Sequence, residues 1–93
     1  MIQIDRAEIR TEVGGVWELK YYVKEIGKVY GIKIERHSRQ EEAETVSEET
    51  EGITPSYEKA QKLAQKLARG MVTPISLHDV VDDLIEDYSE YSF

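Results

Sequence analysis

Four basic side chains occur at helical spacing between residues 57 and 70, and they are the clearest candidates for binding an anion. They are Lys59, Lys62, Lys66 and Arg69, and their spacings of 3, 4 and 3 residues place them on one side of a helix. Such a basic stripe could contact the phosphates of a nucleic acid or an acidic partner. No aromatic residue is interleaved with it and no recognition-helix motif follows it, so a solvated helix face is the favoured interpretation.

Two groups of acidic side chains could hold a cation. Their members are Glu41, Glu42, Glu44, Glu48, Glu49, Glu51, Asp79, Asp82, Asp83, Glu86 and Asp87. Neither group forms an Asp-x-Asp-x-Asp-Gly loop with a distal Glu, which excludes an EF-hand. His37 and His78 are the only histidines, and the remaining ligands of a metal site are missing around them. We therefore expect no metal and no cofactor, and we expect both histidines at the surface.

The sequence also lacks recognisable catalytic machinery. It contains no cysteine and none of the motifs Gly-x-x-x-x-Gly-Lys, Gly-x-Gly-x-x-Gly, Gly-x-Ser-x-Gly or His-Glu-x-x-His. With two isolated histidines, a nucleophile–base pair is hard to assemble. The sequence therefore indicates a protein that is not an enzyme.

The composition indicates one well-solvated domain spanning residues 1–93. A chain of 93 residues, 40% hydrophobic and 33% charged, is long enough for one core and too short for two. Its net charge of −7 disfavours non-specific binding to nucleic acid. No apolar run approaches the roughly 20 residues of a membrane span, no signal peptide is visible, and cysteine is absent. These features predict a soluble cytoplasmic protein without membrane contact.

The stretch Trp17 to Ile26 predicts the central strand of a small antiparallel sheet, because apolar and polar residues alternate along it. The side chains expected in the core are Trp17, Leu19, Tyr21 and Val23, and those expected to face away are Glu18, Lys20, Tyr22 and Lys24. Glycines before and after this stretch predict that both neighbouring segments fold back onto it.

The preceding strand, residues 2–13, changes phase near Asp5 and Arg6, which predicts a bulge or a frayed start. Directly opposite residues in a hairpin share a face, so apolar residues must pair with apolar residues. A three-residue loop, Gly14-Gly15-Val16, meets this requirement. The pairs it predicts are Val13–Trp17, Thr11–Leu19, Ile9–Tyr21 and Ala7–Val23.

The following strand, from Val29 to about His37, requires a different turn. A two-residue Gly27-Lys28 turn of type II′ pairs Val23 with Ile32 and Tyr21 with Ile34. It also places His37 opposite Glu18 on the exposed face. Residues 38–53 allow either a fourth, exposed edge strand or a mobile glutamate-rich loop, and the strand is slightly preferred.

Two helices are expected in the remainder of the chain. Thr54 as N-cap and Pro55 at the first helical position begin one helix, which Gly70 ends. Ser76, with Asp79 three residues later, begins the other. The apolar arcs comprise Tyr57, Ala60, Leu63, Ala64, Leu67 and Ala68 in the first, and Leu77, Val80, Val81, Leu84, Ile85 and Tyr88 in the second. The sequence thus predicts an α+β fold, with a three- or four-stranded antiparallel sheet followed by two C-terminal helices packed on one face.

Aromatic residues outside these arcs are further candidates for partner binding. Tyr91 and Phe93 lie at an acidic terminus, where they either pin the last helical turn or form a patch for a partner. Tyr22 belongs to the sheet face away from the helices. Since helices on one side leave that face open, we expect a protein partner or self-association as a homodimer.

Two motifs in the chain have a structural character. One is Tyr30-Gly31-Ile32, and the other is the run from Val72 to Ile85, Val-Thr-Pro-Ile-Ser-Leu-His-Asp-Val-Val-Asp-Asp-Leu-Ile. In these motifs the chain resembles a family of short uncharacterised bacterial proteins of about this length. The resemblance implies a bacterial, cytoplasmic origin and no particular activity.

The functional hypothesis from sequence is therefore a small non-catalytic interaction or regulatory module. Its candidate contact residues are Lys59, Lys62, Lys66, Arg69, Tyr22, Tyr91 and Phe93. The alternatives are a nucleic-acid contact through the basic stripe, or a small-molecule or metal-binding protein.

Overall fold

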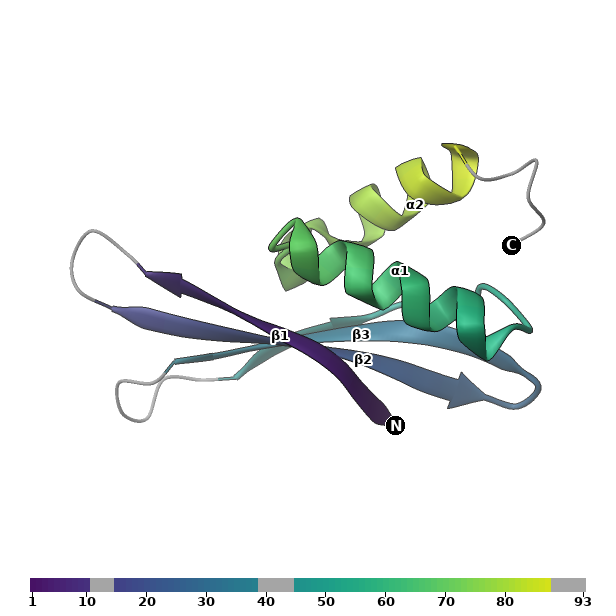
Figure 1. The fold of residues 1–93 in the computed structure, drawn as a ribbon, viewed down its shortest axis with the longest axis horizontal. Helices are drawn as coiled ribbons and strands as arrows, with labels where there is room; N and C mark the ends of the chain where they lie inside the picture. Colours follow the sequence, from purple (N-terminus) through teal and green to yellow (C-terminus); the bar gives the residue numbers. More distant parts are fainter. Residues whose placement is uncertain (11–14, 39–44, 88–93) are drawn as a thin grey trace.

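The predicted α+β fold is confirmed in the computed structural model, which describes residues 1–10, 15–38 and 45–87. The elements in chain order are β1 (Ile2–Arg10), β2 (Val16–Ile26), β3 (Val29–Ser38), β4 (Val46–Glu49), α1 (Tyr57–Arg69), the 3-10 turn η1 (Pro74–Ser76) and α2 (Leu77–Asp87). The strands form one antiparallel sheet in the order β1-β2-β3-β4. Both helices lie on the same side of this sheet (Figure 1). Of the two alternatives for residues 38–53, the exposed edge strand is confirmed as β4.

The turn between β2 and β3 confirms the predicted two-residue connection. Val23 pairs with Ile32 and Tyr21 with Ile34. Gly27 has φ +60°, and Lys28 is not among the described non-glycine residues with positive φ. A positive φ at the first turn position alone is the type II′ geometry, whose twist matches that of the flanking strands.

The predicted register of the first hairpin is wrong. Ile9 lies opposite Trp17 and Ala7 opposite Leu19, whereas the three-residue loop would have placed Ile9 opposite Tyr21. The predicted pairs of Thr11 and Val13 fall outside the described residues. Both registers put the same side chains on the core face, because a slip by an even number of residues preserves the face. The observed register is the one that brings the start of β1 alongside β2, with Ile2 opposite Val23.

The predicted bulge in β1 is confirmed, one or two residues earlier than the change of phase suggested. The register shifts between Gln3 and Asp5. The extra residue, Ile4, turns inward and packs against the core, whereas Asp5 remains exposed. The bulge thus reconciles the two apolar phases of β1 on one sheet face.

Residues 50–54 continue along β3 and explain the motif Tyr30-Gly31-Ile32. Thr50 N donates to Ile32 O at 2.9 Å, and Tyr30 N donates to Thr54 O at 2.7 Å. A Cβ at Gly31 would lie 2.6 Å from the carbonyl oxygen of Glu51, closer than real Cβ contacts allow. Glycine at this position is therefore required by the close approach of another backbone.

Helix α1 begins two residues later than predicted. Ser56, not Thr54, is its N-cap, and the Ser56 hydroxyl accepts a hydrogen bond from Lys59 N at 3.3 Å. Thr54 is buried, because its backbone pairs with Tyr30. Its hydroxyl accepts from Ser56 N at 3.1 Å and so orients the residue that does cap the helix. Gly70 at the C-cap is confirmed.

The core lies between the sheet and the helices, as predicted. Its buried hydrophobic members, among the described residues, are Leu19, Tyr21, Val23, Ile32, Ile34, Ala60, Leu63, Ala64, Leu67, Ala68, Leu77 and Val81. Tyr21 spans this layer, and its hydroxyl donates to the carbonyl of Val72 at 2.8 Å. Helix α2 begins at Leu77, one residue after the predicted Ser76, which belongs to η1. Tyr88 of the predicted apolar arc lies outside the described residues.

Candidate functional site

The sheet face away from the helices is polar and carries the predicted residue Tyr22. This outer face comprises Glu18, Lys20, Tyr22 and Lys24 of β2 and Lys33, Glu35 and His37 of β3. All of these side chains are half-buried, although Figure 1 shows no described element below them. Their burial therefore comes from packing on one another across the strands. The division of β2 by face is confirmed, except that Trp17 is half-buried and stacks 4.5 Å from the Arg36 guanidinium.

Glu35 lies at the centre of the outer face and accepts three hydrogen bonds. Its carboxylate is 3.1 Å from His37 Nε2 and 3.4 Å from Lys33 Nζ, and it also accepts from the Tyr22 hydroxyl. Partial burial acts to raise the pKa of Glu35, but the hydrogen bonds from Tyr22, His37 and Lys33 outweigh it and lower the pKa below its ordinary value. We call these four residues the Glu35 cluster.

Tyr22 is held neutral by the same contacts. Burial, then the hydrogen bond to Glu35 and the nearby negative charges of Glu35 and Glu18, raise the pKa of Tyr22 from 10.0 to about 12. Tyr22 thus presents an aromatic ring in a fixed position and acts as a hydrogen-bond donor. An aromatic side chain immobilised before binding loses little conformational entropy when a partner arrives.

Ion pairs also hold side chains of the outer face in place near both edges of the sheet. Glu18 lies 3.5 Å from Lys20 Nζ and 3.7 Å from an Arg6 nitrogen, and Lys24 Nζ lies 2.8 Å from Glu49. The hydrogen bond from Lys24 lowers the pKa of Glu49. Ion pairs at a protein surface typically contribute little to stability. Their consequence here is geometric, because they fix the positions of charges on an otherwise open surface.

A chain of hydroxyl, imidazole and carboxylate groups runs along one end of the Glu35 cluster. Thr45 Oγ1 lies 3.2 Å from His37 Nδ1, and His37 Nε2 lies 3.1 Å from Glu35. The order of groups matches that of a nucleophile triad. Thr45 is exposed on an open face, however, whereas acyl-transfer chemistry needs oxyanion donors in a site that excludes water. We interpret this row of three polar groups as part of the ordered surface. Sequence reasoning missed it because it depends on the β3–β4 register.

The other histidine occupies a separate place. His78 Nε2 lies 3.3 Å from Glu48, and both side chains are about half exposed, as predicted for a surface residue. Among the described residues, no group of three or more histidine, aspartate or glutamate side chains is arranged to hold a metal ion.

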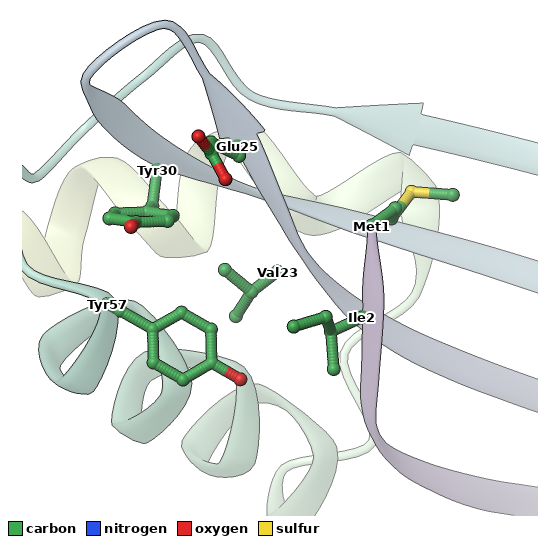
Figure 2. A pocket seen from close by; sticks show the side chains of 6 residues that line it. All are labelled: Met1, Ile2, Val23, Glu25, Tyr30 and Tyr57. Carbon is green, nitrogen blue, oxygen red and sulfur yellow. The ribbon is translucent and has the colours of Figure 1, made fainter.

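Two hollows in the surface are small. One, of about 170 Å³, is lined by Met1, Ile2, Val23, Glu25, Tyr30 and Tyr57 (Figure 2). The rings of Tyr30 and Tyr57 meet in it edge to face, with centroids 5.6 Å apart. The other, of about 250 Å³, is lined by Thr50, Glu51, Ile53, His78, Val81 and Asp82. Sites for drug-sized ligands enclose about 300–1,000 Å³, so neither hollow would enclose such a molecule.

The basic stripe lies on the side of α1 opposite its buried residues. Lys62, Lys66 and Arg69 are exposed and Lys59 is half-buried. Lys62 pairs with Glu58 at 3.3 Å, and both side chains are about three-quarters exposed. Because α1 covers the inner face of the sheet, the structure does not bring the stripe together with Tyr22. The remaining predicted contact residues, Tyr91 and Phe93, lie outside the described residues.

The fold and the outer face define a class of small α+β protein, in which two helices cover one side of a meander sheet. Within that class, the chain belongs to the family of unknown function DUF6514, which matches residues 1–87. The resemblance to a family of unknown function is thereby confirmed. Comparisons with curated proteins and with solved structures gave no match. None of the helices in the described part of the chain has the length and apolar character needed to cross a bilayer.

Proposed function

We propose that this chain is a small non-catalytic interaction module that recognises a protein partner through the outer face of its sheet. The observation that carries the proposal is the Glu35 cluster. Tyr22, Lys33 and His37 converge on one carboxylate on a face that the described helices leave uncovered. A partner would meet side chains that are already ordered, with an aromatic residue near the centre, which is the usual composition of an interface hot spot.

Site-specific photo-crosslinking tests this proposal in native extract. A photoreactive aromatic amino acid replaces Tyr22 in one sample and Lys62, on the basic stripe, in a matched sample. We expect a discrete crosslinked protein from position 22 and none from position 62. The same product must disappear when Lys33→Glu is added, because that change reverses the charge beside Glu35 without touching the core.

Other outcomes contradict the proposal. A product formed only from position 62 would instead support recognition through the basic stripe. A product from position 22 that persists with Lys33→Glu would mean that the Glu35 cluster does not select the partner. Circular dichroism of each variant verifies that the fold is retained.

We further infer that the module acts in the bacterial cytoplasm, which the absence of cysteine supports. Fractionation of the native cells, followed by immunodetection, tests this localisation.

A further inference from the structure

Among the described residues, β1 forms the long edge of the sheet and pairs with β2 alone. Alternation of backbone hydrogen bonds identifies which groups face the open side. Tyr30 and Ile32 of β3 exchange hydrogen bonds with residues 50–54, so their backbone groups point away from β2. In an antiparallel ladder these directions alternate residue by residue.

The residues of β3 that alternate with Tyr30 and Ile32 therefore bond to β2, and the alternate residues of β2, such as Leu19, bond to β1. In β1, Ala7 and Ile9 lie opposite these residues of β2. The backbone groups of Arg6, Glu8 and Arg10 consequently point toward the open edge. One hydrogen bond agrees with this assignment. The backbone N–H of Arg6 donates to the side chain of Asp5 at 2.8 Å rather than to β2. The edge therefore offers a row of backbone donors and acceptors to another strand.

Like charges lie directly opposite each other at two positions between β1 and β2. Glu8 lies directly opposite Glu18, and Arg6 lies directly opposite Lys20. Like charges at directly opposite positions destabilise strand pairing. A diagonal ion pair, at 3.7 Å, joins Arg6 to Glu18.

We propose that β1 pairs antiparallel with β1 of a second copy of this chain, about a twofold axis through Ala7. An axis at Arg6 or at Glu8 would place like charges opposite each other. The axis at Ala7 places Arg6 opposite Glu8 of the partner subunit, and Glu8 opposite the partner's Arg6. Both residues direct backbone groups at the edge, so the pair also satisfies the hydrogen-bond pattern. A twofold interface repeats the complementary pair twice.

The inner side of β1 agrees with this arrangement. Ile4, Ala7 and Ile9 pack against the core but are only partly buried. A second copy continues the sheet past them and covers their exposed sides. Ala7, the smallest of the three, lies on the axis, where the two chains approach most closely. The outer faces of the two copies then form one continuous surface.

Asp5 regulates the pairing. Its carboxylate occupies the N–H of Arg6, which must be released before that N–H can donate to the second copy. Asp5 is exposed, so the exchange needs no change in the core. Its removal therefore strengthens association, because the competing acceptor is lost.

A single cysteine tests the register, since the natural chain has none. Directly opposite, non-hydrogen-bonded residues of antiparallel strands lie about 4.5 Å apart at Cα, within disulfide range. Ala7→Cys should form a disulfide dimer under mild oxidation, whereas Arg10→Cys should not, because residue 10 lies opposite residue 4 of the partner. Absence of the Ala7→Cys dimer, or equal dimer formation by both variants, overturns the proposal.

Charge exchange gives a second test that does not depend on cysteine. Glu8→Arg should weaken self-association in sedimentation velocity roughly tenfold, since two favourable pairs become repulsive. The double variant Arg6→Glu/Glu8→Arg should restore it, and Asp5→Ala should exceed the natural chain. A double variant as weak as the single one, or a natural chain that is monomeric with Asp5→Ala unable to associate, refutes the pairing.

The proposal for the β1 edge and the proposal for the outer face can be refuted independently. Loss of β1 pairing leaves the crosslink from position 22 in place, and loss of that crosslink leaves the Ala7→Cys dimer.

Discussion

Replacing Tyr21 by phenylalanine removes a single hydroxyl from the middle of the core and should change how stability depends on pH. The Tyr21 side chain is fully buried, and its hydroxyl donates to the Val72 carbonyl at 2.8 Å. Losing this hydrogen bond leaves that carbonyl without its partner, so Tyr21→Phe should cost about 1–3 kcal/mol at pH 7.

The cost should decrease in alkaline solution. Burial, with a smaller contribution from the Asp5 charge, raises the pKa of Tyr21 from 10.0 to about 12. Above pH 10 the unfolded chain releases this proton while the folded chain keeps it, so the free energy of unfolding falls as pH rises. The stabilisation is complete below pH 10 and is lost as pH approaches 12. A shift of two pKa units corresponds to about 2.7 kcal/mol of unfolding free energy. The natural chain loses this stabilisation in alkali, whereas Tyr21→Phe has no phenol at this position and does not.

Urea unfolding followed by circular dichroism, in steps from pH 7 to pH 12, measures the difference between the natural chain and Tyr21→Phe. We expect this difference to shrink by about 2–3 kcal/mol across the alkaline range. Ser56→Ala is the control, because the hydroxyl that it removes does not ionise in this range, so its cost should stay constant from pH 7 to pH 12. A Tyr21→Phe difference that stays constant from pH 7 to pH 12 would refute the reasoning.

Three further changes test other parts of the structure. Gly31→Ala should destabilise the fold by about 1–3 kcal/mol in thermal unfolding, because its Cβ would lie 2.6 Å from the Glu51 carbonyl; an unchanged melting temperature would contradict this. Ser56→Ala should cost about 1 kcal/mol and Ser56→Asp almost nothing, whereas equal losses would show that the side chain does not cap α1. Reversing the basic stripe to glutamate should leave the position-22 crosslink unchanged. Salt-sensitive binding of a labelled oligonucleotide that this reversal abolishes would establish a nucleic-acid contact instead.

Face assignments could be predicted from the sequence, but one register could not. Alternation along β2 identified Leu19, Tyr21 and Val23 as core residues, because only one side of the sheet is covered. In the second hairpin, the two-residue turn left a single register. In the first hairpin, every even slip keeps the same faces, so apolar matching could not distinguish Ile9 opposite Trp17 from Ile9 opposite Tyr21.

The start of α1 was misplaced for a tertiary reason. Thr54 and Ser56 are both good capping residues, and local propensity gives no decisive preference between them. The choice is made by the pairing of Thr54 with Tyr30, a contact between segments 24 residues apart in sequence.

The Glu35 cluster was only partly predicted. Tyr22 was assigned to the exposed face from its parity, but its partner was not. The predicted β2–β3 register already placed Glu35 opposite Lys20, one rung from Tyr22, so the signal was present. It was missed because charged residues on an exposed strand face are usually interpreted as solubility residues.

Core and outer-face residues alternate along β2 and β3, so the outer face can change during evolution while the fold is maintained. Each core residue is flanked along its strand by outer-face residues whose side chains never enter the core. Substitutions at Lys20, Tyr22, Lys33 or Glu35 therefore change the outer face without creating a cavity beneath the helices. The sheet can serve as a scaffold for resurfacing, with a new specificity installed on one side and the packing on the other left intact.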